Sequence, residues 1–128
     1  MYIRGKKVAL SSVDAKAILL HFWDSTNDAQ KMMNLDVLKP IYEQYHDRGL
    51  EIYAVGIDAD KTNWARVVNA QKLPWINVND GLGAMSPVVQ LYGISTAPST
   101  ILIGNGDIMA NGISDEASLR KALATILK

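Results

Sequence analysis

The sequence predicts an α/β domain with a central mixed β-sheet and helices on both faces. Apolar runs of strand length alternate with segments whose apolar residues recur every three or four positions, as expected where strands alternate with helices. The last two strand-like runs flank Asn105-Gly106, the preferred dipeptide of a type I′ turn, so they are expected to pair as an antiparallel hairpin. The length of 128 residues fits one domain that covers residues 1–128.

The expected elements follow in order along the chain. A short exposed strand is expected at residues 6–10, and a buried strand at residues 17–23. A long helix is expected from about residue 28 to residue 48, kinked at Pro40 and ended by Gly49. The later elements are a strand at 51–57, a helix that ends near Gln71, a strand at 74–78, a helix from Pro87 to Gly93, strands at 99–103 and 107–111, and a last helix capped by Ser114.

The apolar residues of two helices mark the faces that are expected to be buried. In the long helix these residues are Met32, Leu35, Leu38, Tyr42 and Tyr45. In the last helix they are Ala117, Leu119, Leu123, Ile126 and Leu127. The three tryptophans, Trp23, Trp64 and Trp75, are expected in the core.

Composition excludes several classes of function. Thirteen Lys and Arg balance thirteen Asp and Glu, so no basic field would bind nucleic acid. No apolar run is long enough to span a bilayer and the start has no signal-peptide pattern, so this segment is not expected to insert into a membrane. The cysteine count is zero, which excludes disulfides, thiolate nucleophiles and cysteine-bound metals. His21 and His46 lie far apart, so no metal and no cofactor are expected.

Several stretches, in a specific order and spacing, resemble the thioredoxin fold and, within it, the TlpA/ResA-like thiol–disulfide oxidoreductases, which are related to the redoxins. They are residues 5–12, 18–23, 52–64, 73–75 and 92–103. The resemblance covers nearly the whole chain and implies a thioredoxin-like α/β fold. It also implies a periplasmic or cell-envelope location, and a domain excised from the C-terminal part of a longer chain.

The family places its redox motif, two cysteines separated by two residues, directly after the strand that ends here in Phe22-Trp23. The corresponding positions in this chain read Asn27-Asp28-Ala29-Gln30. Thiol–disulfide exchange needs a thiolate, and an amide is neither a nucleophile nor redox-active. The resemblance therefore implies a family member without its redox centre and without a catalytic residue at these positions.

Pro98 matches the cis-proline of the family, whose preceding residue pairs its backbone with an extended substrate peptide. The resemblance thus predicts a groove, lined by Trp23, Thr26, Asn27, Ala97 and Pro98, that binds an extended protein or peptide segment without cysteine. Two simpler interpretations stay open. Pro98 can serve loop geometry alone, and the polar residues before the long helix can simply cap it.

An enzyme that works without cysteine is the alternative class of function. Asp58 and Asp60 follow a strand and loosely resemble the Asp-x-Asp-x-Thr motif of haloacid-dehalogenase-like phosphotransferases, in which the first aspartate is the nucleophile. The same carboxylates also fit a turn and a helix start. His21 is expected to be a hydrogen-bonded core or groove residue, and His46 to complement a helix C-terminus.

Overall fold

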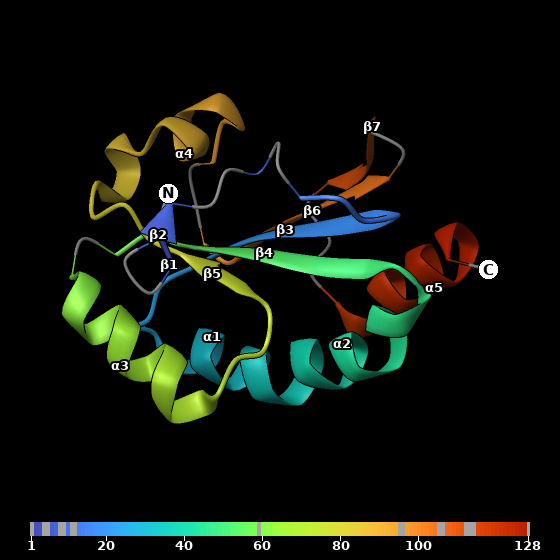
Figure 1. Cartoon of the computed structure of the whole chain (residues 1–128), viewed down its shortest axis with the longest axis horizontal. Helices are drawn as coiled ribbons and strands as arrows, with labels where there is room; N and C mark the ends of the chain where they lie inside the picture. Colours follow the sequence, from blue (N-terminus) through green and yellow to red (C-terminus); the bar gives the residue numbers. More distant parts are fainter. Residues whose placement is uncertain are drawn as a thin grey trace.

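The computed structural model describes residues 2–3, 6–7, 10, 13–58, 60–94, 97–104, 107–111 and 115–127. Its centre is a five-stranded sheet in the order β5-β4-β3-β6-β7 (Figure 1). The strands are β3 (Ala17–Trp23), β4 (Leu50–Gly56), β5 (Ile76–Val78), β6 (Ser99–Gly104) and β7 (Asp107–Asn111). The pairs β3–β4 and β4–β5 are parallel, whereas β3–β6 and β6–β7 are antiparallel. The predicted mixed sheet is confirmed.

Helices cover both faces of this sheet, as predicted. The helices α1 (Asp28–Met33), α2 (Lys39–Tyr45), α3 (Lys61–Gln71) and α5 (Glu116–Ile126) lie on one face, and α4 (Pro87–Leu91) lies on the other (Figure 1). Short 3-10 helices span His46–Arg48 and Gly83–Met85. No helix in the described part of the chain is both long and apolar enough to cross a membrane.

Near the N-terminus, β1 (Tyr2–Ile3) and β2 (Lys6–Lys7) form a separate antiparallel pair. Residues 6–7 of the strand expected at residues 6–10 are in a strand, and residues 8–9 lie outside the described residues. The Asn105-Gly106 turn also lies outside them, although the β6 and β7 strands that flank it pair as the hairpin prediction requires.

The strand β3 is buried on both faces because it is the middle strand and is paired on both sides. Alternate side chains point to opposite faces. Leu19 and Trp23 pack in the cluster under α2, α3 and α5, while Leu20 and Phe22 pack in the cluster under α4. Each such buried side chain contributes about 1.5–3 kcal/mol of hydrophobic stabilisation. The three tryptophans are buried as predicted.

The long helix bends through a π-helical segment, Asn34–Leu38, directly before Pro40. The Lys39 N–H donates to the Asn34 carbonyl, five residues earlier, rather than to a carbonyl four residues earlier. Proline has no N–H to donate and its ring crowds the preceding turn, so a wider turn relieves both problems. A kink was predicted at Pro40, and the structure has this π-helical segment before it. The helical course ends at Gly49, which has a φ of 113°.

The π turn changes which side chains face the sheet. Met32 and Leu35 were predicted to be buried, and this prediction is wrong, because their exposed fractions are 52% and 38%. Gln30, Asn34 and Leu38 are buried instead. A π turn contains more residues than an α turn, so positions four apart come to share one face where three-or-four spacing was expected.

The last helix also differs from the prediction in its cap. Asp115, and not Ser114, is the N-cap residue: its Oδ1 accepts the Ser118 N–H at 2.7 Å. Hydrogen bonds from Ser118 stabilise the carboxylate and lower the pKa of Asp115. Ser114 itself lies outside the described residues. Ala117 is exposed, whereas Leu119, Leu123 and Leu127 are buried as predicted.

His21 is fully buried in the middle of the sheet, which confirms the prediction of a hydrogen-bonded core residue. It lies opposite Thr100 on β6, and its Nδ1 is 3.0 Å from the Thr100 Oγ1. Its Nε2 has no partner among the described residues. Burial disfavours the charged imidazolium and lowers the pKa of His21 from 6.5 to about 4.

This burial makes the stability of the fold sensitive to acid. The pKa of His21 is lower in the folded chain than in the unfolded chain, so the unfolded chain takes up the proton first as pH falls. We expect the His21 contribution to stability to be complete above about pH 7, and to fall by about 3 kcal/mol as pH drops from about 6.5 to about 4. Urea unfolding at several pH values measures this loss.

Two variants separate His21 from the other titrating groups. His21→Asn should flatten the pH dependence, because no imidazole is left to charge in the core. Ala124→Ser should leave the dependence unchanged, because it replaces an exposed residue and removes no titrating group. An equally steep acid loss in His21→Asn would contradict the assignment.

Candidate functional site

The loop after β3 and the residues before β6 lie at the same end of the sheet. The two strands are antiparallel neighbours, and Phe22 near the end of β3 pairs with Ser99 at the start of β6. Residues 24–30 and Ala97-Pro98 are therefore adjacent, as the groove prediction requires. The peptide bond between Ala97 and Pro98 is cis.

Two amides occupy the positions where the family places its cysteines, and both are used structurally. Asn27 is the N-cap of α1, and its Oδ1 accepts the Gln30 N–H at 3.0 Å. The Gln30 side chain is buried, and its Oε1 accepts the Asp24 N–H at 2.7 Å. Each bond contributes on the order of 1 kcal/mol. Together they close the loop in a way that does not depend on oxidation state.

Most backbone donors of this loop are already bonded within the protein. The bonded N–H groups belong to Asp24, Ser25, Thr26, Asn27 and Gln30. Among the described residues, the N–H groups of Asp28 and Ala29 have no acceptor. Asp28 also places a carboxylate in the first turn, where it complements the positive end of the helix. The simpler interpretation, in which polar residues cap the helix, therefore accounts for the geometry of this helix start.

A buried polar cluster fastens the same loop to the rest of the sheet edge. Ser25 is fully buried; its Oγ donates to the Asp58 Oδ2 at 2.7 Å and accepts from the Asn63 Nδ2 at 2.9 Å. The Asp58 carbonyl accepts from the Asn79 Nδ2 at 3.0 Å. The sequence interpretation missed this cluster. A signal was present, since Ser25, Asp58 and Asn79 each follow a strand of the parallel set β3-β4-β5, whose carboxyl ends adjoin.

The carboxylates of the alternative enzyme hypothesis have structural partners. Both Asp58 oxygens accept hydrogen bonds from Ser25, one from the hydroxyl and one from the backbone N–H at 3.3 Å. The Asp60 Oδ1 caps α3 by accepting the Asn63 N–H at 3.0 Å. Within the described residues, no group of three or more His, Asp or Glu side chains is arranged to hold a metal ion. The geometry matches the turn and helix-start interpretation of these residues.

One of the predicted groove residues does not reach the surface. Trp23 was predicted to line the groove, but it is 0% exposed and belongs to the core under α2 and α3. The reason is strand alternation, which points Trp23 toward the helix-covered face. Thr26, Asn27 and Pro98 are exposed and Ala97 is half-buried, so these four residues present surface at this end of the sheet.

The backbone of Ala97 is the unused part of the site. In the described part of the chain, no backbone group bonds to its N–H or its carbonyl. Pairing of β6 with β3 begins only at Ser99. A backbone donor and acceptor without a backbone partner among the described residues can pair with an extended chain.

The buried cluster allows a direct test of what holds the loop. Asp58→Ala removes the acceptor of the Ser25 hydroxyl, and we expect it to lower the free energy of unfolding by about 1–3 kcal/mol. When Ser25→Ala is added to Asp58→Ala, it should lower the free energy of unfolding by less than it does in the wild type, because the two residues are coupled. Urea unfolding of the two single variants and the double variant measures this coupling.

Asp47→Ala is the matched control, because its side chain is fully exposed. Asp47→Ala should change the free energy of unfolding by no more than about 0.5 kcal/mol. Additive losses for Ser25 and Asp58 would contradict the contact. Amide chemical shifts of residues 24–30 should move in Asp58→Ala and stay in place in Asp47→Ala.

Comparison with known proteins gives the family. No family model matches the sequence. The thiol-disulfide oxidoreductase ResA of Halalkalibacterium halodurans is 28% identical over 109 residues, which cover 84% of this chain and 59% of the relative. ResA of Bacillus subtilis is 28% identical over 99 residues, which cover 77% and 53%. The chain thus spans just over half the length of these relatives.

Solved structures extend the match to nearly the whole chain. The C-terminal domain of a protein assigned as a thiol-disulfide oxidoreductase from Bacteroides thetaiotaomicron is 31% identical, with a TM-score of 0.84, over 97% of this chain and 86% of that one. A thioredoxin domain of a thiol-disulfide oxidoreductase from Bacteroides vulgatus has a TM-score of 0.85 at 24% identity, over 98% and 89% of the two chains, which confirms the predicted fold. The chain therefore belongs to the thiol–disulfide oxidoreductase family of thioredoxin-like proteins.

Proposed function

We propose that this chain is a redox-inactive thioredoxin-fold domain that acts by binding, as a protein- or peptide-binding or structural module. The observation that carries the proposal is the cysteine count of zero in a chain with the fold of thiol–disulfide oxidoreductases. Exchange proceeds through a thiolate that attacks a disulfide, and this chain contains no thiol to supply one. What remains of the family's activity is the recognition of a segment.

The half of the old site around Ala97 is the better candidate for recognition. Its N–H and carbonyl have no backbone partner among the described residues, whereas the opposite loop has bonded most of its own donors. Main-chain pairing gives affinity to an extended segment without requiring a particular sequence. Thr26 and Asn27 then form the opposite wall and contact side chains of the segment.

The family resemblance also supports a location for the domain. Family resemblance to the membrane-associated TlpA/ResA-like proteins favours the periplasm or cell envelope, where such a module meets unfolded or extended protein segments. Fractionation of cells that express the native gene, with detection by antibody, tests this location. Recovery in the cytoplasmic fraction would contradict it.

The proposed groove is tested by an amide chemical-shift titration of the ¹⁵N-labelled chain with a set of extended peptides. We expect shifts at residues 26–31 and 97–99, because those backbone groups border the groove. Ala97→Asp should weaken binding by about tenfold or more, because its carboxylate must lose water when a chain pairs beside it. Ala124→Asp, at an exposed alanine of α5, is the matched control and should leave binding unchanged.

If no amide shift changes at either segment on titration, the groove is not a binding site and the proposal is overturned. Reduction of insulin by the purified chain would overturn the redox-inactive part. A metal-dependent phosphatase activity that is lost in Asp58→Asn would favour the enzyme hypothesis instead.

A further inference from the structure

The backbone of β3 points alternately to its two neighbouring strands. On the β4 side, the Ala17 N–H donates to the Gly49 carbonyl at 3.1 Å. The Trp23 carbonyl accepts the Ile57 N–H at 2.9 Å on the same side. In a paired strand both backbone groups of one residue face the same neighbour, and successive residues face opposite neighbours. The odd-numbered residues of β3 therefore face β4, and the even-numbered residues, Phe22 among them, face β6.

The same register places Asp24 opposite Ala97. The ladder between β3 and β6 ends at the pair Phe22–Ser99, and two further residues along β3 and two back along β6 lead to Asp24 and Ala97. Asp24 has the parity of Phe22, so an extended ladder would pair its N–H and carbonyl with those of Ala97. A paired Ala97 would have no backbone group left for a bound segment. The proposed groove thus depends on the ladder stopping at Phe22.

Both backbone groups of Asp24 are bonded inside the loop instead. Its N–H donates to the Gln30 Oε1 at 2.7 Å, and its carbonyl accepts the Asn27 N–H at 3.2 Å. The Gln30 side chain is only 6% exposed, and the Asn27 Oδ1 holds the Gln30 N–H at 3.0 Å, so the acceptor is fixed in place. The groups that would close the groove are therefore occupied by the two residues that stand at the cysteine positions of the family.

We propose that Gln30 is a positioning residue for the groove: its side-chain oxygen holds the Asp24 N–H and so keeps the Ala97 backbone open to a bound segment. This inference rests on the proposed function and gives one of the two amides a role in it. Any fraction of molecules in which Asp24 pairs with Ala97 lowers the apparent affinity for the segment in proportion. Gln30 acts on binding through Asp24, because its own side chain is buried.

Gln30→Met tests this role, because methionine keeps a long unbranched side chain and has no oxygen to accept the Asp24 N–H. We expect the dissociation constant of an extended peptide to rise about tenfold, as for the loss of one hydrogen bond. The measurement is the ¹⁵N titration of the whole chain, at a temperature where circular dichroism shows every variant fully folded.

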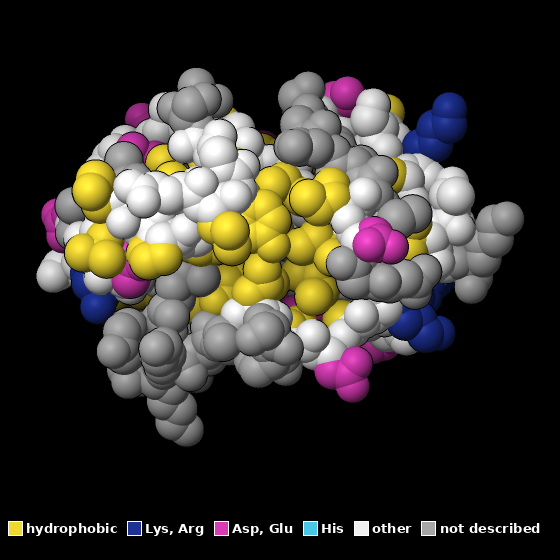
Figure 2. All heavy atoms as spheres, turned by 90° about the horizontal axis from the view of Figure 1, so that it is seen from above, with side chains coloured by type: hydrophobic (Ala, Val, Ile, Leu, Met, Phe, Trp, Pro, Cys, Tyr) yellow, Lys and Arg dark blue, Asp and Glu magenta, His cyan; other side chains and the backbone are white. Residues whose placement is uncertain are grey.

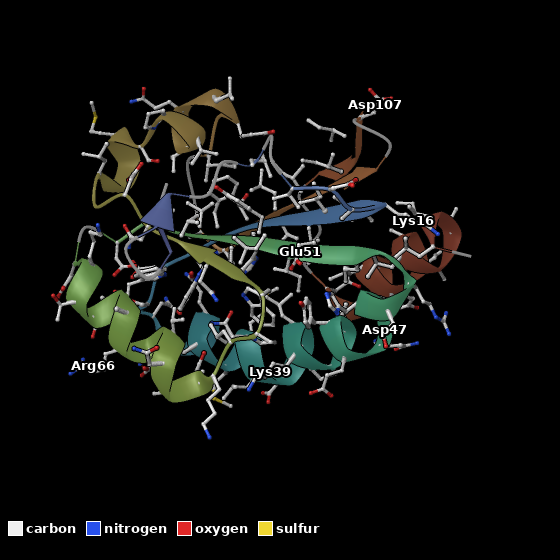
Figure 3. All side chains as sticks on the ribbon, viewed as in Figure 1. Lys16, Lys39, Asp47, Glu51, Arg66 and Asp107 are labelled. Carbon is white, nitrogen blue, oxygen red and sulfur yellow. The ribbon has the colours of Figure 1, made fainter. Side chains whose placement is uncertain are left out.

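Gln71→Met is the matched control. The same replacement in α3 removes two hydrogen bonds to the long helix, one from the Asn34 Nδ2 at 3.1 Å and one to the Lys31 carbonyl at 3.0 Å. The Gln71 carbonyl accepts from the Lys39 Nζ, and Figure 3 shows Lys39 on the helix-covered side of the sheet. Gln71→Met should lower the free energy of unfolding and leave the dissociation constant unchanged, because Asp24 keeps its partner.

A scalar coupling across the hydrogen bond reports the partner of Asp24 directly and needs no peptide. In the wild type we expect a coupling from the Asp24 ¹⁵N to the Gln30 ¹³Cδ. In Gln30→Met we expect a coupling from the Asp24 ¹⁵N to the Ala97 carbonyl carbon, which a merely structural role of Gln30 would not produce. The inference is overturned if Gln30→Met binds the peptide as the wild type does, or if its Asp24 shows no coupling to Ala97.

Failure of the groove itself gives a different result. Figure 2 shows apolar side chains gathered in a hollow on the face that carries α4, where Ile18 and Ile103 are partly buried. Wild-type shifts that are confined to those residues, or absent altogether, would overturn the proposed function and with it a role of Gln30 in binding. The coupling is measured on the chain alone, so it decides separately whether Gln30 holds Asp24 away from Ala97.

Discussion

The two-sided pairing of β3 is the constraint on which the rest of the structure depends. Its register with β4 sets the ends of the parallel strands level, so that Ser25 meets Asp58. β3 pairs with β6 in the antiparallel direction, which brings the loop after β3 beside Ala97. A slip of one residue would turn every β3 side chain to the wrong face, and both cores oppose that slip.

The loop that carries redox chemistry elsewhere in the family is here a closed structural turn. Asn27 and Gln30 stand at the cysteine positions and bond backbone groups of the same turn. The buried hydroxyl of Ser25 anchors the turn to the next loop. The turn is held by amide, hydroxyl and backbone groups, so its hydrogen bonds do not depend on redox potential.

Local patterns predicted most of the fold and failed where a neighbouring element intervened. Apolar runs and turn residues predicted every strand of the central sheet and the start of α1 at Asp28. The buried face of the long helix was misjudged, because periodicity assumes a uniform turn and the π segment before Pro40 is wider. Trp23 was misjudged as a groove residue, because nearness in sequence to a loop does not say which face of the sheet a side chain takes.

The sequence by itself determined that this chain has no thiol chemistry, since a residue type that is absent cannot be supplied by folding. It also determined the α/β class, because the spacing of apolar residues follows directly from the geometry of strands and helices. Only the tertiary structure decided which polar groups are already used. Whether Asp58 is bonded to Ser25, and whether the Ala97 backbone finds a backbone partner among the described residues, depends on contacts between residues far apart in the chain. Hydrogen bonds between loops follow the register of strands, and single-chain periodicity does not contain that register.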